Sequence, residues 1–198
     1  MVQTTRGRPR EFDRDEALSR ATEYFWEHGY DGSGMKDLLD SMGIARQSLY
    51  AAFGDKRSLF LEALKYYYSE HIAPLGARLN RNGSVVANFE AVFSKLGKDG
   101  IGGLERGCFL ANTAAELASE DDEIGKVIQR YLTSLEKGIA KALRRGQEQG
   151  ETRTDMTAES LAGNMVTTMQ GAAVIGKLPH GRKSARLALR ALLAMLVK

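Results

Sequence analysis

The chain has 198 residues, of which 43% are hydrophobic, and a formal net charge of +3 at pH 7. This length allows one or two domains with a sizeable core. The chain has no run of about eighteen apolar residues and its N-terminus is polar, so we expect a cytoplasmic protein without a membrane span. Its single cysteine, Cys108, excludes an internal disulfide, and the three histidines are far apart, which predicts no metal site.

The basic residues are unevenly distributed. Residues 1–60 contain nine Lys and Arg but ten Asp and Glu, a net charge of −1. Arg6, Arg8 and Arg10 lie close together in residues 1–10, which have no hydrophobic periodicity and are predicted to form a flexible basic arm. Such an arm either inserts its arginines into a DNA minor groove or remains a solvated tail that contacts phosphates loosely.

A first helix is predicted from Asp13, whose side chain is suited to capping a helix, to Gly29. Phe25 lies on its inner face, and we expect the adjacent Trp26 to be only half buried at the edge of the core. The following Ser33 is expected either to cap the next helix or to contact a phosphate.

Two short helices are predicted next, joined by a tight turn. The first of them has an apolar stripe of Met35, Leu38, Leu39 and Met42, spaced at i, i+3, i+4 and i+7. Gly43 ends this helix, because glycine accepts the left-handed conformation that a helix terminus often needs. The second helix is expected to begin near Ala45.

The second short helix has an outward face made of hydrogen-bonding side chains. Leu49 and Phe53 are four residues apart and face inward, which leaves Arg46, Gln47, Ser48 and Tyr50 outside. This arrangement has the size and chemistry of a helix-turn-helix that reads the DNA major groove. Arg pairs with guanine and Gln with adenine, whereas Tyr50 and Lys56 are placed to contact phosphates.

Thirteen residues of this region form a recognisable pattern: Phe25, Gly29, Tyr30, Ser33, Asp37, Leu38, Gly43, Ile44, Ser48, Leu49, Tyr50, Phe53 and Lys56. The pattern resembles the N-terminal DNA-binding domain of the TetR family of transcriptional regulators, over roughly residues 11–60. The resemblance implies an all-helical homodimer that binds operator DNA and is released by a ligand. Ala45 departs from the family pattern, which often has a capping Ser or Thr there. A missing cap costs about 1 kcal/mol.

Further helices are predicted at 56–79, with a kink at Pro74, and then at 85–96, 107–117, 122–149, 158–177 and 184–197, with a glycine-rich loop at 97–107. We therefore expect an all-α fold with a flexible basic arm at 1–10, a helix-turn-helix domain at 11–58, and a helical effector-binding and dimerisation domain at 59–198. The two final helices either form a four-helix interface with a second copy or pack in the core.

The predicted function is ligand-responsive regulation of transcription by a repressor that leaves a palindromic operator when a small molecule binds. The expected effector contacts are Tyr67, Phe89, Phe93, Cys108, Asn112, Tyr131, Met165 and Met169. No cofactor is expected, and no arrangement of catalytic residues favours an enzyme.

Two alternatives remain at this stage. Cys108 is either a small buried apolar residue or a redox or electrophile sensor whose pKa is lowered by a helix N-terminus and by Arg106. A helical protein-interaction module is the other alternative, although its partner groove would favour apolar rather than polar side chains on the second short helix.

Overall fold

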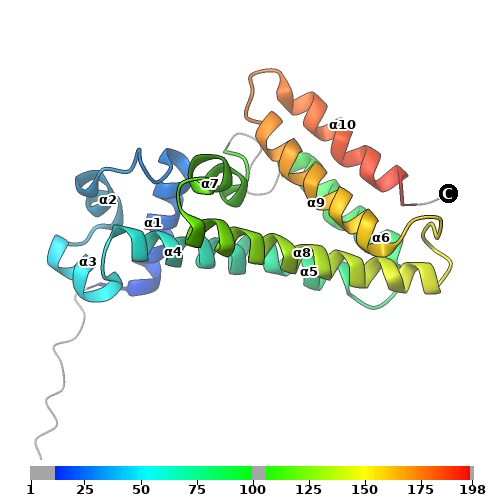
Figure 1. Ribbon diagram of the computed structural model, residues 1–198, viewed down its shortest axis with the longest axis horizontal. Helices are drawn as coiled ribbons and strands as arrows, with labels where there is room; N and C mark the ends of the chain where they lie inside the picture. The colour runs from blue at the N-terminus through cyan, green and yellow to red at the C-terminus, as the bar shows by residue number, and fades with distance from the viewer. Residues whose placement is uncertain (1–11, 100–105, 197–198) are drawn as a thin grey trace, which may run out of the picture. The chain divides into compact units, whose positions relative to one another are not determined.

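The computed structural model describes residues 12–99 and 106–196, and every regular element in these ranges is helical, which confirms the all-α prediction (Figure 1). The chain divides into two compact units, with the boundary between Ala63 and Leu64. The predicted basic arm, with Arg6, Arg8 and Arg10, lies outside the described residues.

The N-terminal unit contains α1 (Arg14–His28), α2 (Met35–Met42), α3 (Arg46–Phe53) and the beginning of α4 (Lys56–Tyr67). Asp13 caps α1 as predicted, accepting hydrogen bonds from the backbone N–H groups of Asp15 and Glu16 at 2.9 and 3.1 Å. The expectation for Trp26 is wrong, because its side chain is only 4% exposed. Both Phe25 and Trp26 are buried, so the buried face of α1 is wider than a single stripe.

The predicted helix at 56–79 is interrupted. It consists of α4, a π-helical turn η1 (Tyr68–Ile72) and α5 (Ala73–Leu79). Pro74 has no backbone N–H, and its ring crowds the carbonyl four residues earlier, so it disfavours regular α-helical bonding at this point. The N–H of Ala73 instead bonds to the carbonyl of Tyr68, five residues back. A wider turn thus replaces the expected kink in one continuous helix.

The C-terminal unit continues with α6 (Val85–Asp99), α7 (Phe109–Leu117), α8 (Asp122–Glu148), α9 (Ala158–Ile175) and α10 (Gly181–Ala194). In this unit α8 packs against α5 and α9, and α10 packs against α9 and α6 (Figure 1). Gly76 and Gly138 meet where α5 packs on α8, and a Cβ added at Gly138 would lie 3.4 Å from the Gly76 Cα, in van der Waals contact.

The helix α10 begins three residues before the predicted start at 184. The preceding turn brings Gly181 against the end of α9, where an added Cβ would lie only 1.7 Å from the carbonyl oxygen of Ile175. Only glycine fits this position without moving the backbone. No helix in the described ranges combines the length and apolar character that crossing a membrane requires.

A carboxylate from a distant turn caps α6. Glu151 Oε2 accepts hydrogen bonds from Ser84 Oγ at 2.8 Å and from the N–H groups of Val85 and Val86 at 2.7 and 3.2 Å. These hydrogen bonds hold the pKa of Glu151 below its usual range, and the bond from the Ser84 hydroxyl has the largest effect. Because the folded-state pKa is lowered, the stabilisation is present above the ordinary glutamate pKa of about 4.3 and disappears as the pH falls through the folded-state value.

We therefore expect Glu151→Gln to lower the urea midpoint of unfolding at pH 7, and the difference from the wild type to shrink between about pH 5 and pH 3. Urea titrations at several pH values measure this. Glu148→Gln is the matched control, since Glu148 is exposed and has no side-chain partner among the described residues. A difference that stays constant down to pH 3 would contradict the capping role.

Candidate nucleic-acid interface

The turn between α2 and α3 has the geometry that the sequence predicts. Gly43 is left-handed, with φ 68° and ψ 32°, and its N–H bonds to the Leu39 carbonyl at 2.9 Å. The N–H of Ile44 bonds to the same carbonyl at 3.3 Å, which closes the C-terminus of α2. The next helix begins after Ala45, which supplies no side-chain cap.

The outward face of α3 is polar. Leu49 and Phe53 are buried as predicted, whereas Arg46, Gln47 and Tyr50 are exposed and Ser48 is partly buried. Tyr50 is 50% exposed although it carries an aromatic ring. One short helix therefore presents a guanidinium, an amide and a phenol to solvent, side chains that pair with base edges and phosphates.

Lys56 lies at the first residue of α4. Its ammonium is 4.4 Å from the centre of the Tyr30 ring, a cation–π contact that the sequence did not predict. Asp55 caps this helix by accepting a 2.7 Å hydrogen bond from the Ser58 N–H, and this bond holds the pKa of Asp55 below its usual range. The start of α4, and with it Lys56, is thus fixed beside the Tyr30 ring.

The capping role predicted for Ser33 is wrong. Gly34 is the N-cap residue of α2, and no side chain caps this helix. The Ser33 hydroxyl is buried and donates a 2.5 Å hydrogen bond to the Gly29 carbonyl instead. It therefore fastens the loop between α1 and α2, and a phosphate contact from Ser33 stays a prediction.

Arg14 of α1 holds the end of α3 through contacts that the sequence analysis did not predict, called the Arg14 brace below. Arg14 Nη2 donates to the Ala52 carbonyl at 3.3 Å and to both Glu62 carboxylate oxygens, at 2.7 and 2.8 Å. The guanidinium also lies 4.5 Å from the centre of the Phe53 ring. Arg14 and Glu62 are 48 residues apart, so no local spacing could have indicated this contact.

Most of the predicted effector residues are in the interior of the C-terminal unit. Tyr67, Phe89, Phe93, Met165 and Met169 are buried, as is Cys108. The remaining two are partly exposed and already have partners. Asn112 donates to the Arg106 carbonyl at 2.9 Å and accepts from Lys177 at 3.2 Å, and Tyr131 stacks on Tyr68 with ring centres 4.3 Å apart.

Cys108 has no exposed surface. Burial raises its pKa, and burial also raises the pKa of the neighbouring Tyr67 hydroxyl. The reactive form of cysteine is the thiolate, which this environment disfavours. The structure therefore favours a packing role for Cys108 over that of a low-pKa sensor.

Two family models match the chain. Residues 17–63 match the model described as bacterial regulatory proteins of the tetR family, and residues 87–192 match that of the tetracyclin repressor-like C-terminal domain. The chain belongs to the TetR family. This regulator is thus a DNA-binding protein that acts in transcription and is not an enzyme.

Individual relatives agree with this assignment. The chain is 39% identical over 160 residues to an HTH-type transcriptional regulator of Bacillus subtilis, YezE, covering 77% of this chain and 80% of YezE. It is 29% identical over 179 residues to the transcriptional repressor ComR of Escherichia coli, covering 87% and 83%. A cysteine-substituted variant of the TetR family regulator CifR, solved with 26-bp double-stranded operator DNA, has a TM-score of 0.82 at 28% identity and covers 96% of this chain and 100% of CifR.

The Arg14 brace predicts a measurable effect on stability. We expect Arg14→Ala to reduce the free energy of unfolding of the N-terminal unit by about 1 to 2 kcal/mol, because one ion pair, a carbonyl bond and a ring contact are lost together. Urea titration followed by fluorescence of Trp26, the only tryptophan, reports on this unit. Arg20→Ala is the control, since its exposed i,i+4 pair with Glu16 contributes about 0.3 to 0.5 kcal/mol. Equal losses would disprove the brace.

The burial of Cys108 predicts slow thiol chemistry. We expect the folded protein to react with a disulfide reagent on the order of 100-fold more slowly than the urea-unfolded chain, because both access and thiolate formation are suppressed. Stopped-flow absorbance measures both rates. A variant that combines Cys108→Ala with Ser119→Cys supplies an exposed thiol for comparison. Similar folded-state rates for the two proteins would restore the sensor hypothesis.

Proposed function

We propose that this regulator is a homodimeric cytoplasmic repressor that binds a palindromic operator through α3 of each copy and leaves it when a small molecule binds the C-terminal unit. The observation that carries this proposal is the polar, solvent-exposed face of α3 on a buried helix-turn-helix scaffold. Support also comes from the repressor ComR and from the CifR variant solved with operator DNA.

In this proposal the side chains of α3 and Lys56 of α4 have different roles in recognition. Arg46 and Gln47, both exposed in the first turn, contact base edges, with guanine and adenine as their favoured partners. Tyr50 and Lys56 contact phosphates, which fix the register of the protein on DNA without reading its sequence. Ser48 is less exposed, and its short side chain contacts DNA only at the edge of this face.

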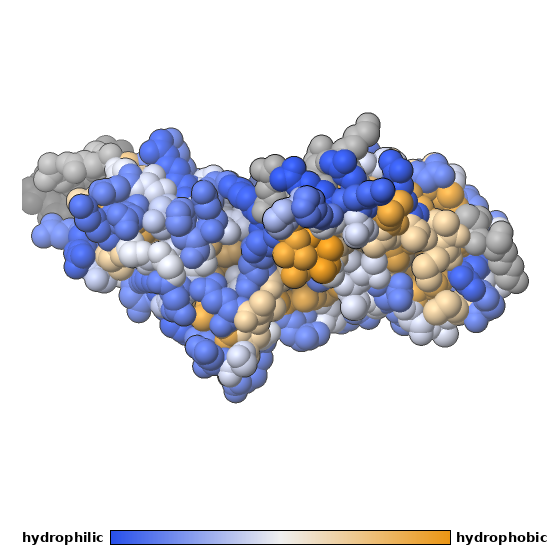
Figure 2. Space-filling view, turned by 90° about the horizontal axis from the view of Figure 1, so that it is seen from above, coloured by the Kyte–Doolittle hydropathy of each residue, from blue (hydrophilic) through white to orange (hydrophobic). Residues whose placement is uncertain are grey.

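Dimerisation is assigned to α9 and α10. Their buried faces pack within the unit, yet Val174, Ile175, Leu178 and Leu187 are between 43% and 56% exposed. Figure 2 looks from the side on which α9 and α10 lie and shows apolar side chains gathered in this region. Burying this surface against a second copy would also place two α3 helices for two operator half-sites.

The effector is assigned to the interior of the C-terminal unit. Two buried polar groups there, the Thr113 hydroxyl on α7 and the Gln170 amide on α9, have no hydrogen-bond partner among the described residues. Each such group costs about 1 to 3 kcal/mol when left unsatisfied. A small molecule with complementary donors and acceptors would satisfy them, so Thr113 and Gln170 join the apolar residues predicted from the sequence.

Release from DNA follows if the effector stabilises a conformation that does not fit the operator. The chain passes from one compact unit to the other within α4, because the boundary between Ala63 and Leu64 falls inside this helix. We assign the coupling between effector and operator binding to α4 for this reason.

The test separates base reading from phosphate binding. An operator is selected from random duplex DNA with the purified protein, and binding is then measured by fluorescence anisotropy at several salt concentrations. We expect Lys56→Ala to weaken binding to all duplexes similarly and to reduce the salt slope by about 1. Gln47→Ala should relax selectivity at one base position, where the wild type discriminates by about 1 to 3 kcal/mol.

Gln129→Ala is the matched control, since Gln129 is an exposed glutamine on α8, and its operator binding should equal that of the wild type. Trp26 fluorescence checks that each variant is folded. Failure to select any duplex, or equal effects of Gln47→Ala on all sequences, would contradict the proposed recognition surface.

A further inference from the structure

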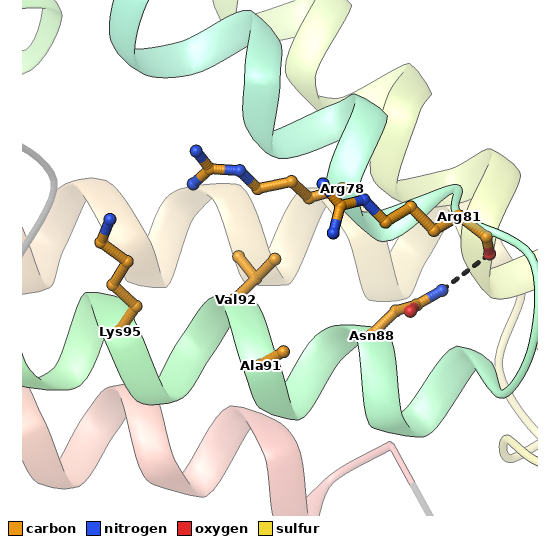
Figure 3. Close-up of a pocket in the computed structure, with 6 residues that line it drawn as sticks. All are labelled: Arg78, Arg81, Asn88, Ala91, Val92 and Lys95. Carbon is orange, nitrogen blue, oxygen red and sulfur yellow. Dashed lines mark hydrogen bonds between the residues drawn. The ribbon is translucent and has the colours of Figure 1, made fainter.

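A cleft of about 250 Å³ lies between α5 and α6 in the C-terminal unit (Figure 3). Six residues line it: Arg78, Arg81, Asn88, Ala91, Val92 and Lys95. None of the eight predicted effector residues is among them, and Phe89 of the same helix is buried elsewhere. The cleft is therefore distinct from the interior to which the effector is assigned above.

Three of the lining residues are cations. Arg78, Arg81 and Lys95 form no ion pair and no side-chain hydrogen bond with the side chains that the structure describes. Figure 3 shows the Arg78 and Lys95 side chains extending into the space beside Val92. Like charges that share one concavity repel each other, and an anion placed between them would reverse the sign of this interaction.

The backbone that carries Arg81 is firmly held. Its carbonyl accepts hydrogen bonds from Asn88 Nδ2 and from Arg145 Nη2, both at 2.8 Å. Arg145 also donates to the Asn80 carbonyl at 3.2 Å. These bonds neutralise the carbonyl groups at the C-terminus of α5, which would otherwise repel an anion. The Arg145 guanidinium also adds a fourth positive charge beside the cleft.

The remaining lining residues define what else a ligand needs. Val92 is 6% exposed and forms an apolar wall, and the short side chain of Ala91 leaves room beside it. The volume is slightly below the range of about 300 to 1,000 Å³ that is typical of drug-sized ligand sites, so the occupant is small. A compact body with two or more anionic oxygens fits this combination.

We propose that this cleft binds a small polyanion, with Arg78 and Lys95 as its principal charged contacts, Arg81 as the third, and Val92 against the apolar part of the ligand. Short dicarboxylates and phosphates share the required chemistry. The dicarboxylate has a carbon chain to place against Val92, whereas phosphate uses the charges alone. Binding at this site does not depend on operator DNA, so the inference goes beyond the proposed function.

Isothermal titration calorimetry of the full-length protein tests the proposal with two probes, succinate and inorganic phosphate, and with 1,4-butanediol as an uncharged analogue of succinate. We expect at least one anion to bind and the diol not to bind. Arg78→Ala and Lys95→Ala should each raise the dissociation constant at least about tenfold, as expected for the loss of a charged hydrogen bond.

Arg130→Ala and Lys137→Ala are the matched controls, because both residues are exposed cations on α8 outside the cleft. Succinate binding alone would assign a carboxylate ligand, and phosphate binding alone a phosphorylated one. Absence of binding by both anions, or equal weakening by the controls, would overturn the proposal. Operator binding is measured on the same samples, so that a failure of the proposed DNA recognition is distinguished from a failure of anion binding in the cleft.

Discussion

The DNA-reading surface proposed for this regulator depends on the contacts that hold α3 in place. This helix has only eight residues and no side-chain cap, and an isolated helix of that length is not stable in water. Its orientation is therefore set by tertiary contacts: Leu49 and Phe53 are buried on one side, and Arg14 binds the Ala52 carbonyl at its end. The polar side chains of α3 remain exposed to solvent because other residues anchor the helix.

The C-terminal unit is held together mainly by a larger apolar core. Its helices bury an apolar core, and two helix ends are held by side chains distant in the sequence, Glu151 at the start of α6 and Arg145 at the end of α5. The buried Thr113 hydroxyl and Gln170 amide have no hydrogen-bond partner among the described residues, and the three cations of the cleft form no ion pair with them. Because most buried polar groups in proteins are hydrogen-bonded, such exceptions mark places suited to ligands.

Hydrophobic periodicity and glycine positions were sufficient to predict the helices, most within a few residues of their ends, and the inward and outward sides of α3. They could not predict contacts between residues distant in the chain. The Arg14–Glu62 pair joins residues 48 apart, and the cleft joins Arg78 to Lys95 across a turn. The predictions of a half-buried Trp26 and a capping Ser33 were wrong for the same reason. The burial of Trp26 and the hydrogen bond from Ser33 to the Gly29 carbonyl both depend on the surrounding packing.

The π-helical turn at Tyr68–Ile72 distinguishes this part of the gene from its flanks in how it responds to a change of length. A bond to the fifth residue back accommodates one residue more than the α-helical bond to the fourth. The wide turn absorbs that residue, so the helices on either side keep their phase. In the regular turns of α4 each residue corresponds to a rotation of about 100°, and deleting a single codon there would turn Leu75 and Leu79, now buried, away from the core.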